Sequence, residues 1–401
     1  MKYRLENICS FGKDRINTAS LTCDNYISTE NMLPNKAGVT KATSLPTVAQ
    51  TQQYSKGDVL VSNIRPYFKK IWLADNDGGC SNDVLVFKSK NNIDKRYLYY
   101  VLANDDFFNY SMATSKGTKM PRGDKASIMA YMIERFNLDA QERIGATLGA
   151  IDDKITLNER INRNLEQQAQ AVLTSFFINF SQFGGVVPDD WEQGTLQDIA
   201  DFSNGYAFKS KELLDTPEPN CYHVFKQGHI KRGGGFNSGG TKSWYPINKS
   251  SSLSKYVLRK GDVLMAMTDM KDNVAILGNT ALMTVDNQYI VNQRVGLLRS
   301  NGYKSTSYAY IYLLTNSFDF LKNLRSRANS GVQVNLSSAE IKASPIWIAT
   351  GEVNKAFNAL VEPLLSMIMA NDIENQRLAD LRDTLLPRLM SGELDVSNLD
   401  V

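Results

Sequence analysis

The sequence predicts a mixed α/β (α+β) protein in which two similar domains are separated by two long antiparallel coiled-coil helices. The whole chain is expected to form an internal repeat with pseudo-twofold symmetry. Three observations predict this fold: short motifs recur about 200 residues apart, each copy opens with β-like segments, and each closes with heptad-spaced apolar residues. We divide the 401 residues at shifts in composition into 1–137, 138–187, 188–349 and 350–401.

Repeated sequence motifs are the evidence for the two copies. Residues 56–60 read KGDVL and return as residues 260–264, an offset of 204. Each copy continues with apolar residues, as a strand leaving a turn does. Residues 5–8 and 196–199 match more weakly at an offset of 191, so the copies differ by insertions in loops.

Each domain is expected to be mixed α/β, because short β-like runs alternate with glycine-rich turns and are followed by an aromatic-rich helical stretch. The expected strands are 59–62, 71–74 and 84–87 in the first domain and 263–267, 275–277 and 294–298 in the second, and the expected helices are 97–108 and 308–324.

Each copy closes with a long predicted helix. Residues 138–180 contain no proline, and their apolar residues follow the alternating steps of four and three that form a helix seam. In the second copy, at an offset of 213, Pro363 is expected to kink the helix and Pro387 to lie in its final turns. The predicted packing residues are Ile144, Leu148, Ile151, Ile155, Asn158 and Leu165 in the first helix and Phe357, Val361, Leu364, Ile368, Asn371, Leu378, Leu381 and Leu385 in the second.

Asn158 aligns with Asn371 at this offset. Paired buried asparagines fix the alignment of two helices at some cost in stability. The alternative is that both residues mark the same surface-facing irregularity. Forty-three helical residues span roughly 65 Å, so two such helices, paired in antiparallel, are expected to hold the domains at a fixed separation.

Positive charge is concentrated in two of the four segments. The net charge of +3 divides into +6 for residues 1–137, −2 for 138–187, +4 for 188–349 and −5 for 350–401. Two separate basic segments suit a polyanion that is contacted in two places.

Several other classes of protein are disfavoured by the composition. No apolar run is long enough for a membrane span, and residues 1–11 lack the apolar core of a signal peptide, so a cytoplasmic location is expected. The four cysteines are expected to be reduced. The two histidines could join Cys221 around a metal ion, but we favour the interpretation that His223 and His229 are ordinary polar residues.

The sequence also lacks the motifs of an enzyme, and we assign no catalytic or metal-binding residue. Residues 63–67 (NIRPY) only approach the Asn/Asp-Pro-Pro-Tyr motif of adenine methyltransferases, and 235–243 only approach a phosphate-binding loop. Asp152 and Asp153 are adjacent and therefore do not share a helix face.

Five stretches resemble those of one protein family. They are residues 56–66 (KGDVLVSNIRP) with 79–83 (GCSND), 150–155 (AIDDKI) with 158–164, and 385–393 (LLPRLMSGE). Their order and duplication make the chain similar to the specificity (S) subunit of type I restriction-modification systems. This resemblance implies target-recognition domains at 1–137 and 188–349, a central spacer helix at 138–187, and a C-terminal spacer helix and tail at 350–401.

The resemblance further implies a non-catalytic subunit that reads a bipartite, asymmetric site in double-stranded DNA. Two modification (methyltransferase) subunits would methylate adenine and restriction subunits would join them, with S-adenosylmethionine, ATP and Mg²⁺ held by these partners and no cofactor in this chain. A standalone bipartite DNA-binding regulator is the alternative. The spacer-helix residues expected either to meet the partners or to complete the intramolecular seam are Leu157, Ala169, Ala171, Leu173, Leu360, Leu365 and Leu386.

Lysine and arginine in glycine-bearing loops are the expected phosphate contacts. Base readers are expected among arginine, asparagine and glutamine near the same loops, and the candidates are Asn35, Asn329, Gln333 and Asn335. The loop 228–242 is the best single candidate, because glycine lets the backbone approach a ligand closely. Tyr206, Phe208, Phe236 and Trp244 could stack on bases, but we favour packing on the domain surface. The predicted DNA-binding residues are Asn35, Lys36, Lys41, Arg65, Lys69, Lys70, Lys116, Lys119, Arg122 and Lys125 in the first domain and Lys209, Lys231, Arg232, Asn237, Lys242, Lys271, Arg325, Arg327, Asn329, Gln333 and Asn335 in the second.

Overall fold

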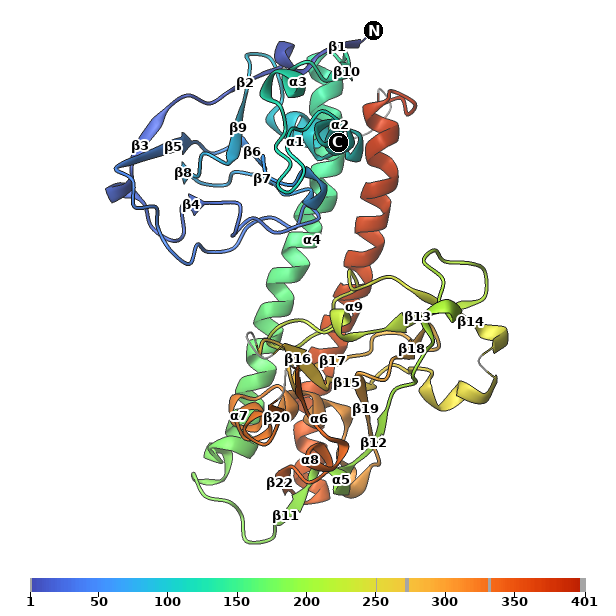
Figure 1. The fold of residues 1–401 in the computed structure, drawn as a ribbon. Coiled ribbons are helices and arrows are strands. Elements are labelled where there is room, and N and C mark those ends of the chain that lie inside the picture. The colour runs from blue at the N-terminus through green and yellow to red at the C-terminus, as the bar shows by residue number, and fades with distance from the viewer. Residues whose placement is uncertain (1, 250, 271–273, 331–332, 397–401) are drawn as a thin grey trace. The chain divides into compact units, whose positions relative to one another are not determined.

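The computed structural model describes residues 2–249, 251–270, 274–330 and 333–396. The chain forms two compact units (Figure 1). Unit 1 contains Met1–Thr156 and Arg377–Val401, and unit 2 contains Leu157–Gln376. Each unit therefore combines one mixed α/β domain with parts of two long helices.

The domain of unit 1 is built on two four-stranded sheets. The first sheet is antiparallel throughout and packs against the helices that follow it in sequence. Its order is β2 (Cys9–Phe11), β9 (Val84–Ser89), β6 (Val59–Ser62) and β7 (Ile71–Leu73). The second sheet has the order β3 (Arg15–Asn17), β5 (Gln50–Tyr54), β8 (Gly78–Cys80) and β4 (Tyr26–Ile27), and β1 (Lys2–Arg4) pairs with β10 (Met132–Glu134). The helices are α1 (Lys95–Ala103), α2 (Asp105–Ala113) and α3 (Lys125–Met129).

The domain of unit 2 repeats this core. Its four-stranded antiparallel sheet has the order β12 (Ala200–Asn204), β19 (Val295–Ser300), β15 (Val263–Ala266) and β17 (Thr280–Leu282), and β11 (Glu192–Thr195) pairs with β22 (Pro345–Ile348). The helices are α5 (Leu196–Ile199), α6 (Tyr308–Thr315), α7 (Phe318–Ser326) and α8 (Ser338–Lys342). Two three-stranded sheets differ from unit 1: β14 (Trp244–Pro246), β13 (Cys221–Phe225) and β18 (Tyr289–Val291), and β16 (Thr268–Met270), β21 (Gln333–Asn335) and β20 (Asn329–Ser330). The repeat is therefore strict in the core sheet and loose outside it.

The repeated KGDVL motif makes the same turn in both domains. Its glycine has a φ of +89° in the first copy and +88° in the second, a conformation that glycine adopts without strain. The buried carboxylate of Asp58 accepts from the N–H of Ser55 at 2.9 Å, and that of Asp262 accepts from the N–H of Arg259 at 2.8 Å. The motif therefore fixes the entry to the central strands β6 and β15.

Two predicted helices are each divided in two. The stretch 97–108 contains the end of α1 and the start of α2, because the side chain of Asn104 accepts from the N–H of Asp106 and starts a new helix. In the second domain α6 ends at Thr315, and α7 begins at Phe318 after Ser317.

One predicted strand is wrong. Residues 275–277 form no strand, and the strand lies instead at β17. The N–H groups of Ala275, Ile276 and Leu277 donate to one carboxylate oxygen of Asp269 at 2.7, 2.7 and 3.2 Å. Three backbone N–H groups that donate to one side chain form a turn. In a strand these N–H groups would instead donate to the carbonyls of a neighbouring strand.

The two long helices are α4 (Leu138–Leu173), which continues as a π-helical turn at Thr174–Ile178, and α9 (Gly351–Met390). Helix α9 contains Pro363 and Pro387 within its helical span. None of the helices in the described ranges is long and apolar enough to cross a bilayer.

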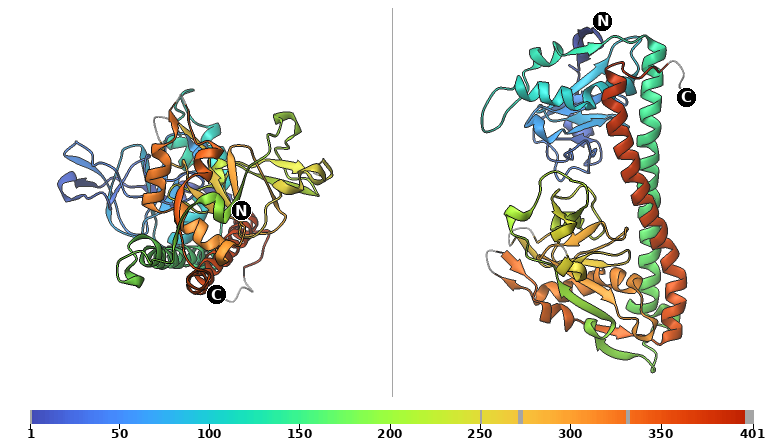
Figure 2. Two further views of the ribbon diagram at one scale, coloured as in Figure 1. Left: turned by 90° about the horizontal axis from the view of Figure 1, so that it is seen from below. Right: turned by 90° about the vertical axis from the view of Figure 1, so that its right-hand side faces the viewer.

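In unit 1 the first part of α4 lies beside the last part of α9 (Figure 2), and both segments share one hydrophobic core with the domain. Ile144 and Leu148 of α4 are fully buried in the same cluster as Leu386 and Leu389 of α9. Further along α4, Asp152 forms a 2.8 Å ion pair with Arg382. Since the residue number rises along α4 while that of its partner on α9 falls, the two segments run antiparallel within unit 1.

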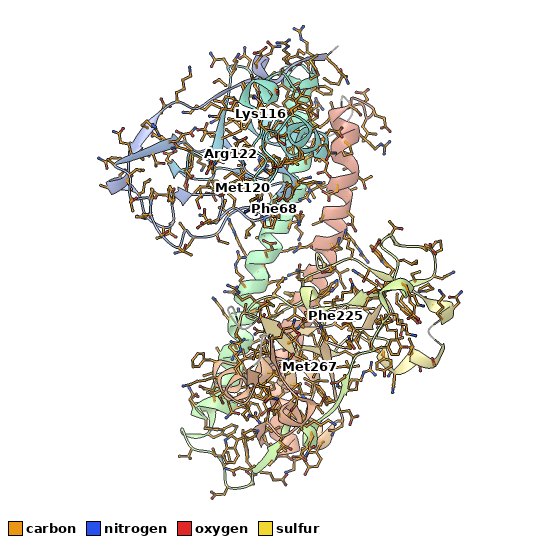
Figure 3. All side chains as sticks on the ribbon, viewed as in Figure 1. Phe68, Lys116, Met120, Arg122, Phe225 and Met267 are labelled. Carbon is orange, nitrogen blue, oxygen red and sulfur yellow. The ribbon has the colours of Figure 1, made fainter. Side chains whose placement is uncertain are left out.

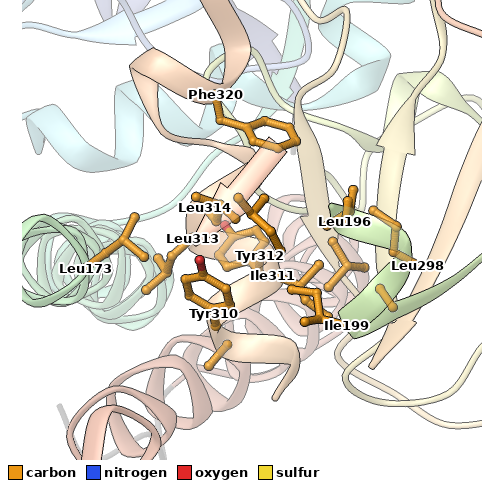
Figure 4. Packing of buried hydrophobic residues seen from close by; sticks show 14 of the residues in the cluster. Leu173, Leu196, Ile199, Leu298, Tyr310, Ile311, Tyr312, Leu313, Leu314 and Phe320 are labelled. Carbon is orange, nitrogen blue, oxygen red and sulfur yellow. The ribbon is translucent and has the colours of Figure 1, made fainter. Parts of the chain in front are cut away.

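In unit 2 the same two helices pack against the second domain (Figure 4). Phe357 of α9 is fully buried, and its ring centroid lies 5.7 Å from that of Phe176 and 5.1 Å from that of Phe177. Phe177 also contacts Tyr310 of α6 at 4.3 Å. An aromatic cluster therefore joins both helices to the domain core of this unit.

A layer of asparagines connects α4 and α9 within unit 2. Asn158 donates to the Asn375 side chain at 2.9 Å, and Asn371 donates to the Asn162 side chain at 2.7 Å. A direct pairing of Asn158 with Asn371, one of the two alternatives given above, is not formed, and neither residue is exposed. At the offset of 213, Asn158 corresponds to Asn371 and Asn162 corresponds to Asn375. The two hydrogen-bonded pairs are therefore copies of one another, as expected for antiparallel helices related by a twofold axis.

The four cysteines are free thiols. Cys9 and Cys80 are buried, and burial raises the pKa of each thiol to about 12. Both are therefore unreactive core residues at neutral pH.

Candidate nucleic-acid interface

Three loops of unit 1 are held together by backbone hydrogen bonds. They are residues 34–37, 63–70 and 114–123. The N–H of Asn35 donates to the carbonyl of Phe68 at 2.8 Å, and the N–H of Arg65 donates to the carbonyl of Pro121 at 2.8 Å. Phe68, Lys116, Met120 and Arg122, labelled in Figure 3, come from the last two of these loops. We call the three loops the first contact surface.

Most of the predicted cations of the first domain lie on this surface. They are Lys36, Arg65, Lys69, Lys70, Lys116, Lys119 and Arg122. Asn35 lies on it as well. The other two predicted cations of the first domain, Lys41 and Lys125, lie outside this surface. Lys41 pairs with Asp24 at 2.7 Å, and the Lys125 ammonium lies 5.8 Å from the centroid of the Phe11 ring.

Carboxylates accompany four of these cations. Lys36 and Lys69 each contact Asp105 at 2.8 Å. Burial raises the pKa of Asp105, but the hydrogen bonds from the two lysines outweigh it and leave this pKa below its usual value. A polyanion bound here would have to compete with Asp105 for both lysines.

Two further carboxylates lie on or beside the surface. Lys116 contacts Asp124 at 2.6 Å, and Arg122 contacts Asp83 at 3.0 Å. The hydrogen bond from Lys116, together with those from Ser127, lowers the pKa of Asp124 to about 2. Asp124 is therefore ionised at any physiological pH and pairs with Lys116 at the protein surface.

The second domain links the corresponding segments in the same way. Strand β16 pairs with β21, so that Thr268 lies opposite Asn335 and Met270 opposite Gln333. The side chains of Gln333 and Asn335 are exposed. These two predicted base readers therefore lie on the segment that corresponds to 120–122 of the first domain. Lys271 lies outside the described residues.

The glycine-rich loop 228–242 lies beside this segment. Gln227, just before the loop, donates to the hydroxyl of Thr268 at 2.7 Å. Within the loop, Asn237 donates to the carbonyl of Gly228 at 2.9 Å, so this predicted contact residue stabilises the loop itself. Lys231, Arg232 and Lys242 are exposed on the loop. We call residues 228–242 and 333–335 the second contact surface.

The remaining predicted residues of the second domain divide into structural and exposed groups. Arg325 donates to the carbonyl of Leu277 at 2.8 Å, and burial lowers its pKa. Arg327 donates to the hydroxyl of Ser344 at 2.8 Å. These two guanidinium groups hold turns together, whereas Lys209 and Asn329 are exposed.

The two histidines lie in one aromatic cluster, and His229 belongs to the glycine-rich loop itself. Their ring centroids are 4.9 Å apart, and Trp244 stacks on His223 at 5.3 Å. His229 is fully buried, and its Nδ1 accepts from the N–H of Lys226 at 3.0 Å. Burial lowers the pKa of His229 to about 4 and also lowers the pKa of His223. Among the described residues there is no group of three or more His, Cys, Asp or Glu side chains that could hold a metal ion.

The aromatic residues that the sequence offered as base-stacking candidates pack within the second domain. Tyr206 contacts Phe208 at 5.0 Å between centroids, and Phe236 lies 6.0 Å from Phe225. The favoured interpretation of these residues, packing on the domain, agrees with these contacts.

Comparison with known proteins identifies the family. The family model described as "Type I restriction modification DNA specificity domain" matches residues 1–167 and 188–378. The chain belongs to this specificity family. It is 24% identical to the type I restriction enzyme HindI specificity subunit of Haemophilus influenzae, over 92% of this chain and 94% of that protein. It is 25% identical to the MjaVIII specificity subunit of Methanocaldococcus jannaschii, over 80% and 76% of the two chains.

The fold is shared with a solved member of the family. The crystal structure of the type I restriction-modification S subunit from M. genitalium matches 97% of this chain and 96% of its own, with a TM-score of 0.60 and 17% sequence identity. This likeness supports the mixed α/β architecture described above.

Sequence reasoning missed two exposed aromatic residues on the first contact surface of this specificity-family chain. Tyr67 is 49% exposed and Phe68 is 38% exposed. The signal was present in the sequence, since a Pro-Tyr-Phe segment stands directly between Arg65 and Lys69.

The apolar residues of the long helices divide between buried and exposed positions. Most of the predicted packing residues are buried or half-buried, but Leu381 is 48% exposed. Of the residues predicted either to meet partners or to complete the seam, Ala169, Leu173, Leu365 and Leu386 are buried in the cores. Leu157 and Leu360 are 51% and 52% exposed in unit 2, where Ile161 and Met367 are exposed as well.

Proposed function

We propose that this chain is the sequence-reading subunit of a type I restriction-modification complex and that it recognises a bipartite, asymmetric DNA site. Residues 1–137 would read one half of the site and residues 188–349 the other. The observation that carries this proposal is the repeated scaffold, which presents linked loops at the same place in both domains but with different side chains. Two different surfaces on equivalent scaffolds suit two unlike half-sites.

We further infer that residues 138–187 and 350–401 act as antiparallel coiled-coil spacers. Within each unit α4 and α9 pack together and run in opposite directions, as the contacts of Asp152 with Arg382 and of Asn158 with Asn375 support. The length of the helices would set the number of base pairs between the two half-sites. The bases in this spacer would not be read.

The catalytic steps are proposed to belong to partner subunits. Two modification subunits carrying S-adenosylmethionine would methylate adenine, and restriction subunits using ATP and Mg²⁺ would complete the complex in the cytoplasm. Leu157, Ile161, Leu360 and Met367 provide exposed apolar surface on the helices of unit 2 for such partners. The family membership favours this assignment over a standalone regulator.

The decisive experiment is genome-wide mapping of methylated adenines in cells with and without this chain. We expect one bipartite motif to lose its methylation on deletion and to regain it on complementation. Exchange of residues 188–345 for those of another family member should change one half of the motif and leave the other unchanged. An unchanged set of methylated adenines would refute the proposal.

A further inference from the structure

A short turn on the first contact surface exposes two neighbouring aromatic rings. Tyr67 and Phe68 form the end of the 3₁₀ turn Pro66–Phe68, and their ring centroids lie 4.6 Å apart at an angle of 52°. Both side chains are exposed, whereas Pro66 of the same turn is buried. Two exposed aromatic rings side by side keep apolar surface in water, and such patches mark interaction sites.

The backbone of this turn is strained in a way that presents the rings. Arg65 before the turn and Lys69 after it have φ values of +50° and +49°, in the left-handed region that non-glycine residues rarely adopt. Strain of this kind persists where the surrounding structure enforces it, and it is concentrated at functional sites. Here the N–H of Arg65 is bound to Pro121 and the carbonyl of Phe68 to Asn35, so neighbouring loops hold the turn.

The charges around the rings point to a polyanion. Lys69 and Lys70 follow Phe68 directly, and the Lys70 ammonium lies 5.8 Å from the centroid of the Phe68 ring. Lys36 reaches the same carboxylate as Lys69. The core of a protein–protein interface is depleted in lysine, whereas aromatic rings among cations are the usual platform for nucleic-acid bases.

We propose that Tyr67 and Phe68 form a stacking wedge that inserts against the bases of the half-site bound by the first domain and locally unstacks them. This inference rests on the proposed function, because it needs DNA on the first contact surface. In the second domain the position equivalent to Pro66 is the exposed Met270, and the sequence continues with Lys271 and Asp272 instead of two aromatic residues. The wedge is therefore confined to one half of the target.

The test uses the full chain assembled with its modification partner on a duplex that carries the mapped motif. Permanganate reactivity of thymines reports unstacked bases in each half-site. We expect enhanced reactivity in the first half-site with the natural chain and its loss in the double variant Tyr67→Ala/Phe68→Ala. Stacking is worth about 1–3 kcal/mol per base, so affinity for the motif should fall about tenfold or more.

Two control variants separate stacking from folding. Tyr67→Phe/Phe68→Tyr keeps both rings and should retain the reactivity and the affinity. Phe318→Ala removes an exposed aromatic ring of the second domain, which is 77% exposed, and should change neither.

The outcomes distinguish this inference from the proposed function. Failure of the natural complex to bind the mapped motif would overturn the proposed function itself. Tight binding without enhanced reactivity, or reactivity unchanged in the alanine double variant, would overturn the wedge alone. Loss of the modification partner from the double variant in the absence of DNA would also overturn it, since the rings would then contact protein.

Discussion

The two domains contain equivalent hydrogen bonds in their scaffolds, but the side chains on their contact surfaces differ. In each domain a buried aspartate, Asp58 or Asp262, holds the turn before the central strand, β6 or β15. The segment after that strand forms backbone hydrogen bonds with a later loop, 114–123 in the first domain and 333–335 in the second. On this frame both domains present cations, but the first adds two exposed aromatic rings, whereas the second adds exposed neutral amides beside a glycine-rich loop. The comparison teaches that the side chains of the contact surface can differ while the hydrogen bonds of the scaffold stay the same.

The largest difference between the domains should appear at the repeated aspartate. Asp262 is buried and binds the Arg299 guanidinium at 2.8 Å through two nitrogens, whereas Asp58 lies 3.9 Å from Lys88, which also pairs with Asp14. Asp262→Ala leaves a half-buried guanidinium without its carboxylate, with backbone carbonyls as its remaining acceptors, and should cost about 3 kcal/mol of unfolding free energy. Asp58→Ala loses mainly one turn hydrogen bond and should cost about 1 kcal/mol.

Urea unfolding followed by hydrogen exchange of peptides from each domain would measure both losses. Equal losses for the two variants would show that the ion pair adds nothing to the shared turn.

Acid should affect the second domain through a group that the first domain lacks. Both histidines of the chain lie in the second domain, and burial lowers the pKa of His229 to about 4, below the usual value of 6.5. The unfolded chain therefore binds a proton that the folded chain excludes, and stability falls as the pH is lowered from 7 towards 4. Between pH 7 and pH 5 the loss should be about 2 kcal/mol.

The measurement compares the natural chain with His229→Gln by urea unfolding at pH 7 and pH 5. Burial raises the pKa of Asp372 in the same unit to about 6, so its contribution has the opposite sign, but it is present in both proteins and cancels. An equal response of the two proteins to pH would rule out His229 as the acid-sensitive group.

Much of the scaffold could be predicted because its signals are local. The heptad spacing in 138–180 predicts a long helix, and KGDVL predicts the strand at 59–62, which is confirmed as β6. The division of the first aromatic-rich stretch depends on one cap at Asn104, which the apolar pattern does not reveal. The turn at 275–277 depends on Asp269, whose role is visible only once the chain has folded.

The sequence predicted which kinds of residue form the contact surfaces, but not which of these residues contact one another. Glycine-bearing loops rich in lysine could be recognised from the sequence. That Lys36 and Lys69 share Asp105, and that Arg327 is committed to holding a turn, follow from residues far apart in sequence. Tertiary contacts of this kind leave no periodic signal along the chain.

The asparagine layer allows the two copies of the helix to be compared directly. Asn158 is 1% exposed and donates to both Glu374 and Asn375, whereas its equivalent Asn371 is half-buried and donates to Asn162. Asn158→Ala removes two hydrogen bonds made by a buried amide and should cost about 2 kcal/mol, and Asn371→Ala, which removes one from a half-buried amide, about 1 kcal/mol. Thermal unfolding of both variants measures the difference, and a larger loss for Asn371→Ala would contradict the assigned hydrogen bonds.

The smallest expected effect is on DNA affinity and tests how the first contact surface is held before binding. Asp105 contacts two lysines at once, so we expect a phosphate that reaches Lys36 and Lys69 to compete with this carboxylate. Asp105→Asn should raise affinity for DNA of any sequence a few-fold at low salt, because each freed cation adds about one unit to the dependence of log affinity on log salt. Asp106→Asn removes the same charge from the neighbouring residue and serves as the matched control. Titration of the assembled complex with DNA at several salt concentrations measures the affinity and its salt dependence for both variants. If Asp105→Asn and the natural chain show the same slope of log affinity against log salt, Asp105 orders the lysines for phosphate and does not compete with it. In that case the affinity of Asp105→Asn should fall.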